Sequence, residues 1–66
     1  MELKVNGIAL EMDIVTLQDL IEEQKLLEKK GIAVSLNENL IPRANWLITM
    51  LEDGDDVLIL EAVQGG

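Results

Sequence analysis

Cysteine and histidine are both absent from this 66-residue chain. Their absence excludes disulfide bridges and the usual zinc ligand sets. It also excludes nucleophilic catalysis by cysteine or by a serine activated by histidine, because the thiol and the imidazole base are missing. We therefore do not expect this chain to be an enzyme, and we expect no bound metal or cofactor.

Aromatic residues and cations are scarce. With one Trp and no Phe or Tyr, the core must be aliphatic, and the stacking platforms of single-strand-binding proteins are missing. The 13 acidic residues against 5 basic ones give a net charge of −8, which repels phosphate backbones and anionic lipid. We expect no nucleic-acid or membrane partner, and a basic face on any protein partner. No leader or membrane-spanning apolar stretch is evident, so we expect a cytoplasmic protein.

The first twelve residues predict a β-hairpin. Polar and apolar residues alternate on both sides of Asn6-Gly7. Asn-Gly between such runs is a strong hairpin signal, because a type I′ turn needs positive φ at both central positions. A two-residue loop places all six apolar side chains on one face. The predicted pairs are Val5 with Ile8, Leu3 with Leu10 and Met1 with Met12.

A helix is predicted across residues 17–29. Thr16 and Asp19 have the spacing of a capping box at its start, and Lys29-Lys30-Gly31 supplies the cations and glycine typical of a helix end. The intervening charges are interpreted as a solvated helix face. The predicted inward face comprises Leu17, Leu20, Ile21, Gln24 and Leu27.

The second half of the chain predicts two strands, a helical turn and a last strand. Residues 32–36 form the third strand, and a turn at 37–39 leads to a short strand, Leu40-Ile41, which Pro42 confines to an edge. Residues 43–51 are ambiguous. We expect one irregular helical turn there, with Trp46, Leu47 and Met50 packed on the core. A tight turn at 52–55 precedes a strand from 56 to 63.

The last strand has apolar residues at both parities, which is typical of the centre of a sheet. The element order predicts an α+β, β-grasp (ubiquitin-like) fold, with a mixed sheet of four or five strands wrapped around one main helix. Val57 and Ile59 would then meet the helix. Leu58, Leu60 and Ile41 would form an apolar docking patch on the open face, unless a loop or a second copy covers them.

The sequence closes with Gly65-Gly66. Because glycine has no Cβ, such a tail can thread through a narrow channel into another protein's active site. A frayed terminus or a cloning remnant would look the same. We expect a β-grasp domain over residues 1–63 and a flexible Gly-Gly tail over residues 64–66.

Several short motifs occur together in one order over the whole chain. They are Asn6-Gly7, Asn37, Ile41-Pro42-Arg43, Trp46, Asp53-Gly54-Asp55 and Gly65-Gly66. In this arrangement the chain resembles the thiamine-biosynthesis sulfur carrier proteins (ThiS-type). The small subunit of molybdopterin synthase shares the fold and the tail, but it is usually longer. The short chain and the stretch from Pro42 to Trp46 favour the thiamine branch.

The resemblance implies a carrier whose partners perform the chemistry. A ThiF-type adenylyltransferase would use ATP to adenylate the carboxylate of Gly66, and a persulfide sulfur donor would convert it to a thiocarboxylate. A ThiG-type thiazole synthase would receive the sulfur. Gly65 would keep the tail narrow, and Gln64 and Val63 would form its stem. The free protein is expected to be a monomer.

Two other classes of function remain open at this point. A ubiquitin-like interaction module with an inert tail would tolerate residues added after Gly66, whereas a carrier must end or be cut there. The acidic residues at 52, 53, 55 and 56 could imitate a catalytic carboxylate pair or a hard-cation site. Acidic turns are usually only solvated, and the chain offers no nucleophile or base beside them.

Overall fold

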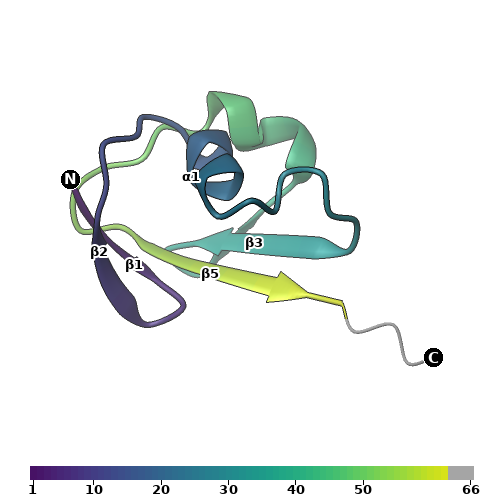
Figure 1. Ribbon diagram of the computed structural model, residues 1–66, viewed down its shortest axis with the longest axis horizontal. Helices are drawn as coiled ribbons and strands as arrows, with labels where there is room; N and C mark the ends of the chain where they lie inside the picture. Colours follow the sequence, from purple (N-terminus) through teal and green to yellow (C-terminus); the bar gives the residue numbers. More distant parts are fainter. Residues whose placement is uncertain (63–66) are drawn as a thin grey trace.

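A five-stranded mixed sheet carries a helix on one face in the computed structural model, which describes residues 1–62 (Figure 1). The strand order is β2-β1-β5-β3-β4; β1 and β5 are parallel, and the other neighbouring strands are antiparallel. The predicted α+β, β-grasp architecture is confirmed, with β5 in the central position that its apolar pattern indicated. The strands are β1 (Glu2–Val5), β2 (Ile8–Glu11), β3 (Ile32–Leu36), β4 (Asn39–Ile41) and β5 (Asp56–Glu61).

The opening hairpin has the predicted register. Val5 lies opposite Ile8, and Leu3 lies opposite Leu10. The Met12 N–H donates to the Met1 carbonyl at 2.8 Å, which continues the same pairing. The predicted common face is buried only in part, because Ile8, beside the turn, is mostly exposed.

The helix α1 (Leu17–Glu23) begins as predicted but ends six residues early. Thr16 and Asp19 form the reciprocal hydrogen bonds of a capping box. At the other end, Lys25 adopts a φ of 62°. Its N–H donates to the Glu22 carbonyl at 2.9 Å, and the Leu26 N–H donates to the Ile21 carbonyl at 3.0 Å. These two bonds make a Schellman motif, which ends the helix.

The prediction of a helix through Lys29 was therefore wrong. Leu26 and Leu27 continue the apolar pattern, but they pack on the core from an irregular loop, residues 24–31. Gln24 is exposed rather than part of the inward face. Gly31 lies immediately before β3, as predicted, but it does not end the helix, which stops at Glu23.

The segment after β4 is a 3-10 helix, η1 (Arg43–Ile48), which confirms the irregular helical turn. Trp46 packs into the core as predicted, but Leu47 and Met50 are mostly exposed. A 3-10 helix has three residues per turn, so Leu47 points away from the side that carries Trp46. Met50 lies beyond the end of η1, in an isolated β-bridge with Thr16.

The core lies between α1, η1 and the inner face of the sheet (Figure 1). It is aliphatic apart from one aromatic side chain, as the composition predicted, and full burial of each such side chain contributes about 1.5–3 kcal/mol. Within residues 1–62, no helix is long and apolar enough to cross a membrane. The buried residues are Leu3, Val5, Leu17, Leu20, Ile21, Val34, Trp46, Leu51, Val57 and Ile59.

Candidate functional site

The candidate site comprises the end of β5 and the sheet face that α1 leaves open. β5 leads away from the end of the molecule that holds the N-terminus (Figure 1). The predicted last strand extended to residue 63, whereas β5 ends at Glu61. The predicted tail residues Val63, Gln64, Gly65 and Gly66 lie outside the described residues, and so does the predicted domain boundary.

The two leucines of β5 lie on the open face, as predicted. Leu58 is 46% exposed and Leu60 is 57% exposed, whereas Val57 and Ile59 between them are buried. On the neighbouring strand β3, Ser35 lies opposite Leu58, and Ala33 lies opposite Leu60. Because these neighbours are small, they leave the two leucines standing out from the sheet.

The placement of Ile41 on this face was wrong. Ile41 pairs with Val34, which is fully buried, and it packs half-buried against the core. Leu40 pairs with Ser35, is 71% exposed and shares the open face with Leu58. A one-residue difference in register exchanges the two faces of a strand. The apolar patch therefore consists of Leu40, Leu58 and Leu60.

The length of the turn before β4 decides this register. Asn37 and Glu38 have φ values of 49° and 72°, as the central residues of a two-residue type I′ turn do. Leu36 consequently pairs with Asn39, and β4 begins one residue earlier than predicted. The sequence-based prediction assumed a three-residue turn at 37–39. A two-residue turn at Asn37-Glu38 would have predicted Leu40, and not Ile41, on the open face.

Carboxylates border the apolar patch. A shallow depression beside Leu58 is lined by Glu38 and Asp56 together with Gly7 and Ser35. Both carboxylates are on exposed residues. An apolar patch with an acidic border is complementary to a partner surface that is apolar at its centre and basic at its edge.

The carboxylates of the acidic turn at 52–55 accept hydrogen bonds from β1, from the turn itself and from Asn37. The Asp53 carboxylate accepts the Glu2 N–H at 2.6 Å, and the Asp55 carboxylate accepts the Glu52 N–H at 2.8 Å and the Asn37 side-chain amide at 3.0 Å. Across residues 1–62, the acidic side chains form no cluster of three or more that could hold a metal ion. These carboxylates hold the turn in place between β1 and the β3–β4 turn.

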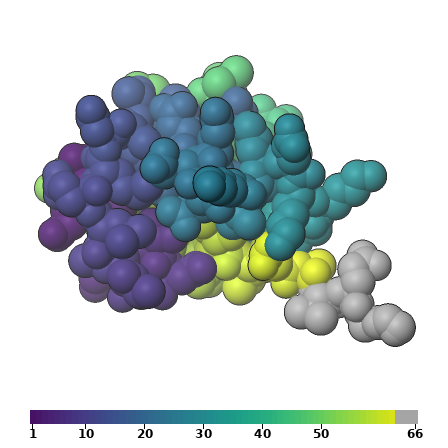
Figure 2. Space-filling view, viewed as in Figure 1, coloured from purple at the N-terminus to yellow at the C-terminus, as the bar shows by residue number. Residues whose placement is uncertain are grey.

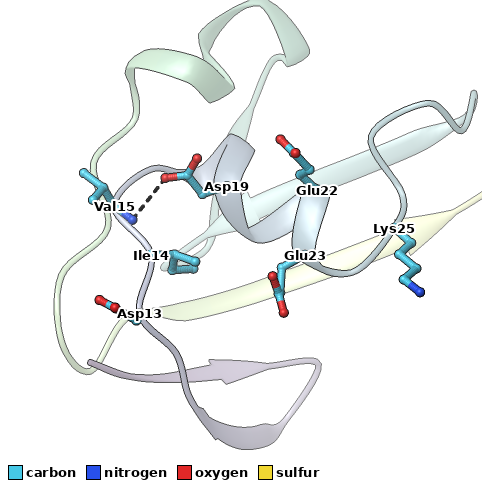
Figure 3. A pocket seen from close by; sticks show the side chains of 7 residues that line it. All are labelled: Asp13, Ile14, Val15, Asp19, Glu22, Glu23 and Lys25. Atoms are coloured by element: carbon cyan, nitrogen blue, oxygen red, sulfur yellow. Dashed lines mark hydrogen bonds between the residues drawn. The ribbon is translucent and has the colours of Figure 1, made fainter.

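A second hollow lies beside α1 (Figure 3). The Asp19 carboxylate in it accepts the Thr16 N–H at 3.0 Å and the Val15 N–H at 3.1 Å. These backbone hydrogen bonds, that from Thr16 first, lower the pKa of Asp19 below its usual value. Glu22, Glu23 and Lys25 splay apart around the end of the helix (Figure 3). The hollow is therefore a solvated helix surface, and its one fixed carboxylate is committed to the helix cap.

The fold and the open face define the class of protein. A mixed sheet around one helix, with the C-terminal strand at its centre, is a ubiquitin-like β-grasp domain. The ThiS family model matches residues 3–66, and the chain belongs to this family. The resemblance to the thiamine-biosynthesis carriers is thus confirmed.

Individual relatives agree with this assignment. The chain is 29% identical over 51 residues to the sulfur carrier protein ThiS of Escherichia coli, a match that covers 77% of this chain and 76% of the relative. The crystal structure of the thiamine biosynthesis protein ThiS from Geobacter metallireducens superposes with a TM-score of 0.83 at 29% identity, over all of both chains. An NMR structure of a thiamine biosynthesis protein from the same organism gives a TM-score of 0.80 at 28% identity, over all of this chain and 88% of the other.

Proposed function

We propose that this protein is a sulfur carrier of thiamine biosynthesis and that other proteins act on it as their substrate. The observation that carries the proposal is the extent of the family match, which runs along the β-grasp domain and through Gly65-Gly66 to the last residue. The relative from Escherichia coli is itself named a sulfur carrier protein. The chain's lack of cysteine and histidine is consistent with a carrier rather than a catalyst.

The proposed chemistry begins at the carboxylate of Gly66. A carboxylate is a poor electrophile, because its negative charge repels nucleophiles. A ThiF-type adenylyltransferase would transfer AMP to it from ATP and release pyrophosphate, which makes the carbonyl carbon reactive. ATP is thus a substrate of the partner, and no cofactor need bind this chain.

Sulfur would then enter from a persulfide donor. The terminal persulfide sulfur attacks the carbonyl carbon of the acyl-adenylate, AMP leaves, and an acyl disulfide joins the two proteins. A thiol next attacks the donor's sulfur, becomes part of a new disulfide, and releases the thiocarboxylate on Gly66. A thiocarboxylate is ionised at neutral pH and is a soft nucleophile, so it can deliver sulfur to a ThiG-type thiazole synthase and return as the carboxylate.

The described residues would serve recognition. Leu40, Leu58 and Leu60 give the partner an apolar contact, and the acidic border and the net charge of −8 steer a basic face towards it. Val63 and Gln64 would form the stem of the tail. Gly65 would let it pass through a channel with no room for a side chain.

Mass spectrometry of the C-terminal fragment tests the proposal. The protein is incubated with ATP, a ThiF-type adenylyltransferase and a persulfide donor. Exchange of oxygen for sulfur adds nearly the mass of one methionine oxidation, so cleavage after Met50 must first separate the fragment from Met1, Met12 and Met50. A mass shift on Gly66 is expected. An unmodified Gly66, with a partner that modifies its own carrier, would favour an interaction module with an inert tail.

A further inference from the structure

The loop of residues 24–31 holds the last described residues of the chain. The Ala62 N–H donates to the Gly31 carbonyl at 2.8 Å, and the Lys29 ammonium lies 2.8 Å from the Glu61 carboxylate. A Cβ placed on Gly31 would lie only 3.1 Å from the Cβ of Ala62. The surface of this loop adjoins the yellow end of β5 in Figure 2. The end of β5 is thus held by a backbone hydrogen bond and an ion pair, and the space beside Ala62 leaves little room for a side chain at position 31.

Arg43 in turn holds this loop. Its guanidinium donates to the Leu27 carbonyl at 2.8 Å through Nη1 and to the Lys29 carbonyl at 2.7 Å through Nη2. The same guanidinium lies 4.6 Å from the centroid of the Trp46 ring. The planar fork of an arginine can hold two carbonyls and stack on an aromatic ring at once, which a lysine cannot do equally well.

Trp46 connects this arrangement to the core. Its side chain is buried, and its indole N–H donates to the Ile41 carbonyl at 2.9 Å. A continuous set of contacts therefore runs from the core through Trp46 and Arg43 to the loop, and from the loop to Glu61 and Ala62. The exposed Lys29–Glu61 ion pair adds little stability by itself. The ion pair can still orient the end of β5, which the hydrogen bond from Ala62 to Gly31 already holds near the loop.

We propose that Arg43 is a positioning residue for the carrier tail: by holding residues 27–31, it sets where the chain leaves the sheet after Ala62. The role in the reaction rests on the function proposed above. Gly66 is the fourth residue after Ala62, so it can lie at most about 14 Å from it. With the domain docked through its sheet face, a displaced Ala62 would displace the reacting carboxylate, and misplacement by about 1 Å can reduce a rate about 100-fold.

Site-resolved amide hydrogen exchange of the whole protein tests whether Arg43 holds Ala62 in place. In Arg43→Ala the Ala62 amide should exchange about 10-fold faster or more, because the loop that accepts its hydrogen bond is released. The Ile59 amide of the same strand donates to Asn6 and should be unaffected, which makes it the internal reference. Arg43→Lys, which can reach one carbonyl but cannot bridge both as a fork, should give an intermediate rate at Ala62.

Adenylation kinetics test whether this positioning matters for the reaction at Gly66. They are measured at a temperature where every variant is folded. Arg43→Ala should lower kcat by about 10- to 100-fold and leave KM nearly unchanged, because the docking leucines are untouched. A merely stabilising arginine would accelerate exchange at Ala62 and Ile59 alike, or leave kcat at the wild-type value. Either result would overturn the proposal.

Arg43→Lys decides the matter should Arg43→Ala fail to fold, because it keeps the positive charge but cannot bridge the Leu27 and Lys29 carbonyls as a fork. A wild-type exchange rate at Ala62 in Arg43→Lys would overturn the proposal. Lys30→Ala is the control for the loss of a nearby positive charge, since this exposed lysine forms no ion pair within residues 1–62. If Gly66 of the wild-type protein were never modified, the proposed carrier function would be wrong. The exchange data would still show whether Arg43 positions Ala62.

Discussion

The side-chain oxygen of Asn6 accepts the backbone N–H of Ile59 at 2.7 Å. The parallel pairing of β1 with β5 stops at Val5 and Val57, because the chain turns back into the hairpin after Val5. The Asn6 side chain takes over at that point and satisfies a donor of β5 that would otherwise lack a partner on this side. One residue thus provides both the positive φ of the turn and a link to the central strand.

Replacement of Asn6 should separate these two roles. Asn6→Gly keeps the turn, because glycine adopts positive φ freely, but leaves the Ile59 N–H unsatisfied. We expect a loss of about 1–2 kcal/mol in the free energy of unfolding, measured by urea denaturation. Asn6→Asp keeps an acceptor oxygen and should lose less. Equal losses in the two variants would show that the link to Ile59 does not stabilise the fold.

The left-handed conformation of Lys25 makes it a site for stabilisation. Its φ of 62° lies where glycine is favoured at the end of a helix. Lys25→Gly should raise the free energy of unfolding by about 0.5–1 kcal/mol and the melting temperature accordingly. Lys25→Ala, which removes the same charge but keeps a Cβ, is the control and should not stabilise. A gain in both variants would point to the charge instead of the backbone.

Two leucines of similar exposure on different faces test the docking surface. Leu60 lies on the open sheet face with 57% exposure, and Leu47 lies on η1 with 62% exposure. Leu60→Ser should raise the KM for the adenylating partner by about 10-fold or more, whereas Leu47→Ser should leave it unchanged. Steady-state adenylation kinetics measure both. Similar effects in the two variants would contradict docking through the sheet face.

Gly65→Ala tests the narrow channel. The substitution should leave the melting temperature unchanged and lower kcat/KM for adenylation by about 100-fold, because a methyl group would displace the reacting carboxylate. Gln64→Ala is the control, since a channel that accepts glutamine at this position has room for alanine. Unchanged kinetics in Gly65→Ala would argue against a tail threaded through a tight channel.

The capping carboxylate of Asp19 should make stability depend on pH. Its pKa is lowered in the folded protein by the backbone hydrogen bonds, so its ionised form favours folding. This contribution is complete above the pKa of an unfolded aspartate and is lost as pH falls through the lower pKa of the folded state. The melting temperature of Asp19→Asn should therefore fall below that of the wild type at neutral pH and approach it in acid. Asp13→Asn, which removes another carboxylate of the same hollow, is the control. A difference in melting temperature between Asp19→Asn and the wild type that does not change with pH would contradict the prediction.

Local patterns were sufficient where neighbouring residues decide the structure. Asn6-Gly7 predicted the hairpin and its register, and Thr16 with Asp19 predicted the start of α1. The two-sided apolar pattern of residues 57–60 predicted the central strand. Each of these features depends on a turn, a cap or an alternation of side chains within a few residues, which the sequence displays directly. The order of short motifs was likewise enough to indicate the family.

The tertiary structure decided what depends on distant contacts. The apolar residues Leu26 and Leu27 extend a helical pattern past Lys25, but the helix has ended at Glu23 and both leucines pack on the core from the loop. Leu40 and Ile41 are adjacent and alike, so their faces depend on the pairing of β4 with β3. Arg43 binds carbonyls 14 and 16 positions earlier in the chain. No local periodicity encodes such a bond, because its partners are brought together only when the sheet, the loop and η1 are packed around one core.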